Sequence, residues 1–168
     1  MSASIIDQAM KQFGSNPQSA KTTPAVTAVL ANGHARLSAG PFNWDADLPA
    51  SLGGGNQAPS PTAYVLGALA GCAVAFLADT LAPQFGVEID ELTATARCSA
   101  DLAGLLGIDG SVPDLQQLTV DIEVVSPSPD GRVEAMRQAW LDRCPIYLAL
   151  LKPADVTVMF RRVEGRRS

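Results

Sequence analysis

Cysteine and histidine are scarce in this chain, and their scarcity excludes two kinds of site. The 168 residues include three cysteines, widely separated in the sequence, and a single histidine. An odd and sparse set of cysteines does not form a disulfide framework, and it is typical of a reducing compartment. One histidine cannot make a His-rich metal site, so we expect neither a metal ion nor another cofactor.

Basic residues are also few. Lys and Arg number 12 against 17 Asp and Glu, which gives a net charge of −5. Nucleic acids and anionic membranes both attract basic patches, so neither is an expected partner. The first residues, MSASIIDQAMKQ, lack the basic segment and apolar core of a signal peptide, and we expect a cytoplasmic protein.

The chain also lacks an apolar run long enough for a typical membrane span. Residues 63–78 carry no charge, but they number only 16, whereas a transmembrane helix needs about 20. Ser60 and Pro61 are typical of a helix start, so we expect a buried core helix over 62–81. Gly67 and Gly71 would let another backbone approach that helix closely.

The whole sequence shows a pattern of alternating strands and amphipathic helices, which predicts one domain, 1–168. Strands are predicted over 25–31, 34–39, 42–48, 87–100, 115–126 and 155–163, and helices over 5–13, 62–81, 132–143 and 144–151. Asn32–Gly33 is a strong hairpin signal, and 101–113 is either an apolar loop or a broken helix. The expected class is α+β, with a helix and linker (1–23) before a core (25–162) of helices packed against antiparallel strands.

The three cysteines differ in their expected environments. Cys144 precedes Pro145, which suits the first position of a helix, so a thiolate there would face the positive end of the helix dipole. Arg143 adds a positive charge, and both effects lower a thiol pKa. A plain helix cap is an equally good interpretation. Cys72 lies about three turns into its helix, where a free cysteine is usually a small buried hydrophobe, and Cys98 in a strand has no expected role.

Two motifs resemble those of the OsmC/Ohr family. The stretch GGGNQAPSPTAYVLGALAGC, which ends at Cys72, resembles the glycine-rich loop and long helix that carry the first cysteine of that family. The later RCPIYLALLKP, with Cys144, resembles the second motif, 72 residues further on. The order of the elements over 25–162 is also similar. The resemblance implies an intertwined homodimer with each active site at the subunit interface.

The resemblance also implies a chemistry and its participants. Cys72 would attack an organic hydroperoxide, fatty-acid hydroperoxides included, and become a sulfenic acid. Cys144 would condense with it to a disulfide, and a lipoyl-type dithiol would reduce the pair. This assignment of roles opposes the dipole argument, which makes Cys144 the more acidic thiol, and we follow the resemblance.

In the OsmC/Ohr family an Arg of the N-terminal hairpin activates the first cysteine, and a Glu near the start of the central helix holds that Arg. Here the hairpin offers Arg36 or His34, and Arg36 is the expected catalytic residue. Thr62–Ala63 stand where the Glu is expected, so no carboxylate is available there. Asp45 and Asp47 are candidate substitutes, although solvated carboxylates at a strand end are the more ordinary interpretation.

Three functions follow from these residues. The first is a thiol peroxidase whose substrate lies in an apolar cleft. Phe42, Trp44 and Tyr64 are expected to line this cleft, and residues 102–106 are further candidates. The simpler interpretation of these side chains is that they belong to an ordinary hydrophobic core. The second is a non-catalytic protein of the same fold that binds an apolar small molecule or senses redox state, which the missing Glu favours.

The third function is a zinc site. It would use Cys72, Cys98, Cys144 and His34, but their spacings fit no standard zinc pattern, which makes it improbable.

Overall fold

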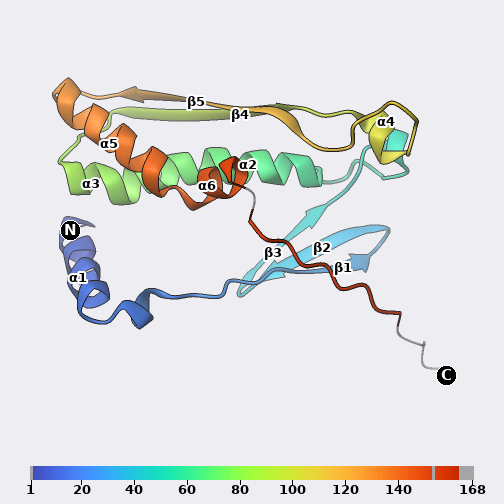
Figure 1. The fold of residues 1–168 in the computed structure, drawn as a ribbon, viewed down its shortest axis with the longest axis horizontal. Coiled ribbons are helices and arrows are strands. Elements are labelled where there is room, and N and C mark those ends of the chain that lie inside the picture. Colours follow the sequence, from blue (N-terminus) through green and yellow to red (C-terminus); the bar gives the residue numbers. More distant parts are fainter. Residues whose placement is uncertain (1, 153, 163–168) are drawn as a thin grey trace.

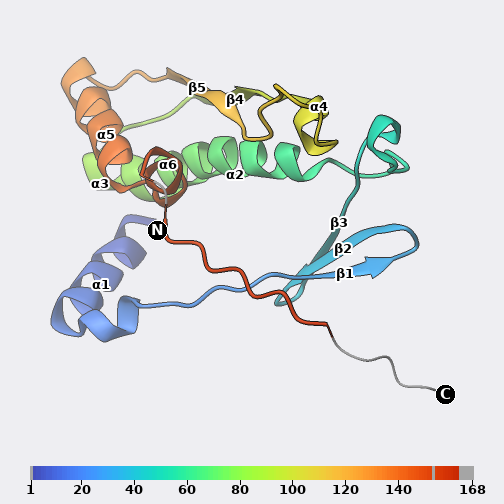
Figure 2. The same cartoon turned by 45° about the vertical axis from the view of Figure 1, so that its right-hand side comes forward.

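The computed structural model describes residues 2–152 and 154–162 (Figures 1 and 2). The elements in chain order are α1 (Ser2–Ser15), η1 (Pro17–Ala20), β1 (Thr27–Ala31), β2 (His34–Ala39), β3 (Phe42–Ala46), η2 (Ala50–Leu52), α2 (Pro61–Ala75), η3 (Phe76–Leu81), α3 (Ala82–Phe85), β4 (Glu91–Ser99), α4 (Leu102–Leu105), β5 (Gln116–Val125), α5 (Asp130–Arg143) and α6 (Pro145–Leu151). The central helix lies between a two-stranded ribbon, β4–β5, and a three-stranded sheet, β1–β2–β3. The predicted α+β class is confirmed.

The N-terminal sheet is the predicted antiparallel meander. Asn32 and Gly33 both have positive φ, 52° and 85°, as a two-residue hairpin turn requires. Gly40 makes the second tight turn with φ 55°. These two turns set the register, in which Arg36 lies opposite Asp45 and Leu37 opposite Trp44.

The central helix is longer than predicted, because α2, η3 and α3 form one helical run from Pro61 to Phe85. The Ser60 hydroxyl accepts a hydrogen bond from the Ala63 N–H at 3.2 Å and caps the start. Near the end, Pro83 removes a backbone donor and crowds the preceding turn, and the wider π-turns of η3 come directly before it.

This helical run is long and apolar enough to cross a membrane by length and composition alone. The core helix of a soluble protein passes the same test, and here α2 packs against β4 and α6. Only 28% of the most apolar window is buried in the single chain. A Cβ added at Gly67 or Gly71 would meet nothing within 4 Å, so the expected burial of the helix is only partly met within one chain.

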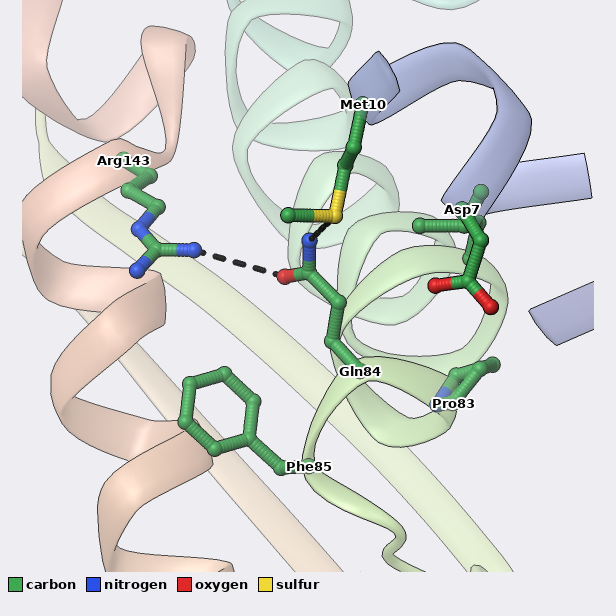
Figure 3. A pocket seen from close by; sticks show the side chains of 7 residues that line it. Asp7, Met10, Pro83, Gln84, Phe85 and Arg143 are labelled. Atoms are coloured by element: carbon green, nitrogen blue, oxygen red, sulfur yellow. Dashed lines mark hydrogen bonds between the residues drawn. The ribbon is translucent and has the colours of Figure 1, made fainter.

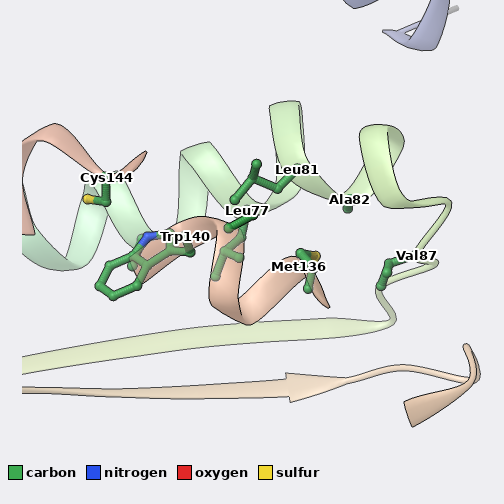
Figure 4. Close-up of a cluster of buried hydrophobic side chains, with 9 residues drawn as sticks. Leu77, Leu81, Ala82, Val87, Met136, Trp140 and Cys144 are labelled. Carbon is green, nitrogen blue, oxygen red and sulfur yellow. The ribbon is translucent and has the colours of Figure 1, made fainter. Parts of the chain in front are cut away.

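The hydrophobic core lies where α5 crosses the second half of the central helix (Figure 4). Its largest fully buried side chains are Leu81, Met136 and Cys144. The inner faces of β4 and β5 cover it with alternate half-buried side chains. The core therefore contains one of the two cysteines that the sequence singled out.

The predicted final strand, 155–163, is not formed. Residues 154–162 run extended from the end of α6 but pair with no strand in the described part of the chain, and Val163 lies outside it. Val156, Val158 and Phe160 are 83%, 82% and 98% exposed. Alternating apolar residues favour a strand, but a strand needs a neighbour to pair with, and residues 2–152 and 154–162 of the single chain supply none.

A buried carboxylate shapes the glycine-rich loop before the central helix. Asp47 is 7% exposed, and its carboxylate accepts the backbone N–H groups of Leu48, Gly55 and Gln57 at 2.8–3.0 Å. The bond from Gln57 is the main cause of its lowered pKa, which the bonds from Leu48 and Gly55 lower further. The expectation of a solvated carboxylate at Asp47 is therefore wrong.

The tight fold of this loop predicts an intolerant glycine. A Cβ at Gly54 would lie 2.0 Å from the backbone oxygen of Leu48, so we expect Gly54→Ala to lower the free energy of unfolding by about 2 kcal/mol or more. Gly131 in α5 has open space around its Cβ position, and Gly131→Ala should raise the free energy by about 0.5–1 kcal/mol. Urea denaturation followed by circular dichroism measures both, and equal stability of the two variants would contradict the packing described.

Candidate functional site

Two cysteines meet where α6 begins. The Sγ atoms of Cys72 and Cys144 are 3.3 Å apart, the distance of a thiol–thiol hydrogen bond. Cys72 lies in the last turn of α2, near the middle of the helical run from Pro61 to Phe85, and Cys144 is the residue between α5 and α6. A disulfide bond is about 2 Å long, so a small local movement brings the two sulfurs to bonding distance.

The bend between α5 and α6 fixes Cys144. Its N–H donates to the carbonyl of Trp140 at 2.9 Å, and its own carbonyl accepts from Leu148 at 3.0 Å, so the residue ends one helix and starts the next. The rings of Trp140 and Tyr147 lie 5.2 Å apart across the bend. These contacts hold the thiol against α2.

The two thiols differ in access and environment. Cys144 is 0% exposed, whereas Cys72 is half-buried. Burial is the main cause that raises the pKa of Cys72 to about 11, and the adjacent thiol of Cys144 raises it further, while the backbone N–H of Ile146 acts in the opposite direction. The first turn of α6 thus points an N–H group at Cys72, whereas the sequence predicted that the start of this helix would act on Cys144.

No cationic side chain is among the groups that shift the pKa of Cys72. Arg143, expected to act on Cys144, instead donates from Nη1 to Gln84 Oε1 at 3.3 Å, and Gln84 Nε2 donates to Met10 Sδ of α1 (Figure 3). Because burial and the neighbouring thiol raise the pKa of Cys72 to about 11, this thiol is protonated at neutral pH. The pair is therefore close but not activated within one chain.

Arg36 and His34 lie together on the N-terminal sheet, and they share one carboxylate. Arg36 Nε donates to Asp45 Oδ1 at 3.0 Å, and His34 Nε2 lies 3.5 Å from the same oxygen. The bond from Arg36 is the main cause that lowers the pKa of Asp45. The Asp45 side chain is still 35% exposed, so it is a solvent-accessible carboxylate that also pairs with Arg36, although Thr62–Ala63 supply none.

The hydroxyl of Tyr64 connects this sheet to the central helix, because it donates to the backbone oxygen of Asp45 at 2.5 Å. Tyr64 and Trp44 both line an apolar cleft of about 680 Å³ between the sheet and α2. Phe42 does not line this cleft and is 70% exposed. Residues 102–106 do not line it either.

The cleft and the charged cluster lie on opposite faces of the sheet. Ala35 and Leu37 line the cleft, and side chains alternate along a strand, so Arg36 between them points to the other face. The structure thus brings Trp44 and Tyr64 together and Cys72 and Cys144 together. It does not bring Arg36 to Cys72 within one chain.

Cys98 takes no part in this site. It lies half-buried in β4 at a register irregularity between Arg97 and Ser99. Among the residues that the structure describes, no three His, Cys, Asp or Glu side chains gather as metal ligands would. The zinc interpretation therefore finds no support in this geometry.

The family model described as OsmC-like protein matches residues 53–159 of the chain. No curated protein matches the sequence significantly.

Solved structures with the same fold include three bacterial proteins. An OsmC-like protein from Mycoplasma pneumoniae has a TM-score of 0.66 and 20% identity over 79% of this chain and 90% of its own. An organic hydroperoxide resistance protein OsmC from Legionella pneumophila has a TM-score of 0.56 and 17% identity over 79% and 92%. The organic hydroperoxide resistance protein OhrB of Bacillus subtilis has a TM-score of 0.50 and 19% identity over 80% and 94%.

The short distance between the sulfurs predicts the product of mild oxidation. On a denaturing, non-reducing gel, diamide-treated protein should run as a single chain with one internal disulfide, because Cys72 and Cys144 need only a small shift to bond. Peptide mapping after alkylation should find these two cysteines linked and Cys98 alkylated. A disulfide that includes Cys98, or chains linked to one another, would contradict the geometry.

Proposed function

The chain belongs to the family of OsmC-like proteins, and we propose that it is a thiol peroxidase that reduces organic hydroperoxides, including those of fatty acids, in defence against oxidative stress. The observation that carries this proposal is the 3.3 Å distance between the Sγ atoms of Cys72 and Cys144. Structures of similar fold from Legionella pneumophila and Bacillus subtilis are named as organic hydroperoxide resistance proteins, which supports the same role.

The proposed reaction has three steps. The Cys72 thiolate attacks the outer oxygen of the hydroperoxide, the O–O bond breaks, and the alkoxide takes a proton and leaves as the alcohol. The resulting sulfenic acid condenses with the Cys144 thiol, which forms the disulfide and releases water. A lipoyl-type dithiol then restores both thiols and becomes a cyclic disulfide itself.

Access supports Cys72 as the attacking thiol. Cys144 is fully buried, so a hydroperoxide reaches it only after the bend opens, whereas Cys72 is half-buried. The N–H of Ile146 already favours the thiolate of Cys72. What this thiol lacks is a cation, which would also stabilise the departing alkoxide.

An intertwined homodimer would supply that cation, and two features of the single chain support such an assembly. The Gly67–Gly71 face of the central helix has open space in front of it, and the extended residues 154–162 leave Val156 and Phe160 exposed. Both surfaces are too apolar to stay open. We propose that a second copy covers them and brings its Arg36, held by Asp45, to Cys72.

In this role the chain would be one domain of a soluble protein in a reducing cytoplasm. The free state of all three cysteines is consistent with that compartment. The central helix would then serve as a dimer core.

A second candidate is a non-catalytic protein that binds an apolar molecule or senses redox state through the same thiols. The pKa of about 11 for Cys72 favours it, because an unactivated thiol reacts slowly with peroxides. The absence of a carboxylate at Thr62–Ala63 favours it as well.

Single substitutions of the two cysteines test the peroxidase proposal. Cys72→Ser should abolish consumption of cumene hydroperoxide. Cys144→Ser should allow one oxidation and leave a sulfenic acid on Cys72, which dimedone traps and mass spectrometry detects. An adduct in Cys72→Ser but not in Cys144→Ser would reverse the two roles, and no reaction in any variant or in the parent protein would favour the non-catalytic candidate.

Removal of the proposed cation should slow the first step. Arg36→Ala should reduce the rate of sulfenic acid formation by roughly tenfold or more and move the pH midpoint of Cys72 alkylation upward, because the thiolate loses its counter-charge. Asp45→Asn should have a smaller effect in the same direction, since Arg36 loses the partner that orients it. Arg97→Ala is the matched control, as this arginine pairs with Asp121 on the exposed face of the β4–β5 ribbon. Equal rates in all three variants would exclude Arg36 from the reaction.

The assembly is tested at the small-residue face. Gly67→Leu has room in the single chain, so the subunit should keep its helical circular dichroism while the dimer dissociates. Sedimentation velocity at micromolar concentration measures this, and a parent protein that is a stable monomer would contradict the proposed dimer.

A further inference from the structure

His34 lies beside the ion pair to which the proposed function assigns the activation of Cys72. Its side chain is 12% exposed, and its Nε2 lies 3.5 Å from Asp45 Oδ1. Arg36 donates to the same oxygen from Nε at 3.0 Å, and from Nη2 to Oδ2 at 3.5 Å. Arg36 is the main cause of the lowered pKa of Asp45, and His34 lowers it further. One carboxylate is therefore shared by two basic groups, of which only the arginine is always charged.

A second carboxylate lies on the same face of the sheet. Side chains alternate along a strand, so His34 and Arg36 share one face of β2. The register that pairs Ala35 with Ala46 places Asp47 opposite His34, and both residues line a hollow of about 370 Å³ between the hairpin and the glycine-rich loop. The charge of His34 also acts on Asp47, whose carboxylate is already held by three backbone N–H groups.

The other elements around the imidazole bring no further charge. The neighbouring strand β1, Thr27–Ala31, contains no ionisable residue, and neither does the loop 52–57. From α2, the hydroxyl of Tyr64 donates to the backbone oxygen of Asp45 and so steadies the strand that carries this carboxylate. In the described part of the chain, the charged cluster around His34 thus consists of one arginine and two carboxylates.

The protonation state of His34 decides the charge balance of this cluster. With a neutral imidazole, the two carboxylates outweigh the guanidinium of Arg36, whereas with an imidazolium the opposite charges balance. Protonation therefore makes the surroundings of Arg36 more positive. The Arg36 side chain is 53% exposed, so a group outside the chain would feel the difference.

We propose that His34 is a positioning residue for the Arg36–Asp45 pair, and that its protonation strengthens the effect of Arg36 on the Cys72 thiolate of a second copy. Such a role rests on the proposed function, in which Arg36 supplies the cation that Cys72 lacks. The thiolate fraction itself falls as the pH falls, so the expected consequence is a shallower loss of Cys72 reactivity at low pH than a thiol alone would show.

The sharing of Asp45 is tested by NMR on untagged protein, because His34 is the single histidine of the chain and its ring signals are unambiguous. In Asp45→Asn the midpoint of the ring titration should lie roughly half a pH unit or more below that of the parent, since the imidazolium loses an anionic neighbour. In Arg36→Gln it should lie above, since a competing cation is gone. Asp121→Asn removes a carboxylate that pairs with Arg97 on the β4–β5 ribbon, so it is the matched control and should match the parent. Equal midpoints in the parent and Asp45→Asn would overturn the proposed sharing.

The effect on Cys72 is measured by the pH profile of its alkylation with N-ethylmaleimide, followed by peptide mass spectrometry and without any hydroperoxide. The ratio of the parent's rate to that of His34→Gln should rise at least about twofold from about pH 8 to about pH 6, the range in which an imidazole gains its proton. His34→Lys carries a lasting charge and should stay faster than His34→Gln throughout. With Asp45→Asn added to both proteins, the ratio should stay nearly constant, because the shared carboxylate is gone. If substitution of His34 prevents folding, the profiles of the parent and Asp45→Asn decide, and they should differ in slope below about pH 7.

The remaining outcomes separate this role of His34 from the proposed function. A ratio that does not change with pH, or one that changes equally with Asp45→Asn, would exclude His34 as a positioning residue while Arg36→Ala still slows the alkylation of Cys72. If Arg36→Ala leaves that alkylation unchanged, the proposed cation is refuted, and the effect of His34 on Cys72 is refuted with it, whereas the NMR midpoints still report whether the two basic groups share Asp45.

Discussion

The seating of helix α5 on the central helix is the interaction on which the rest of the site depends. Met136 and Trp140 are buried there, 1% and 3% exposed, against Leu77 and Leu81. The carbonyl of Trp140 then fixes the N–H of Cys144, and Cys144 lies against Cys72. Each large core side chain contributes about 1.5–3 kcal/mol by burial, so the distance between the sulfurs is set by the core rather than by a flexible loop.

The same core explains why Cys72 lies close to Cys144 and yet has a raised pKa in one chain. Burial that fixes the pair also disfavours charge, and it raises the pKa of Cys72 to about 11. One N–H from α6 opposes this effect, but no cation does. Arg36 and Asp45 form a ready ion pair on the N-terminal sheet, on the face away from the apolar cleft. In the proposed function, a second copy of the chain supplies the cation that Cys72 lacks in a single folded chain.

Much of this arrangement could be predicted from the sequence, because local patterns decide it. Ser60 and Pro61 start the central helix as expected, and the α+β class follows from the alternation of the strands. The pairing of Arg36 with Asp45 could also have been predicted. A two-residue turn at Asn32–Gly33 and a tight turn at Gly40 fix the register of the strands, and this register places Arg36 opposite Asp45. The roles of Asp47, of the N–H of Ile146 and of the unpaired 154–162 segment could not be predicted, because they depend on contacts between distant parts of the chain.

In the proposed function, Cys72 and Cys144 act together on an organic hydroperoxide. The most direct test is anaerobic mixing of the fully reduced protein with one equivalent of cumene hydroperoxide, with hydrogen peroxide in parallel, followed by a count of free thiols. We expect the organic hydroperoxide to remove two of the three thiols per chain, faster than hydrogen peroxide does, and to leave Cys98 free. Three free thiols per chain after prolonged exposure to the organic hydroperoxide would contradict it.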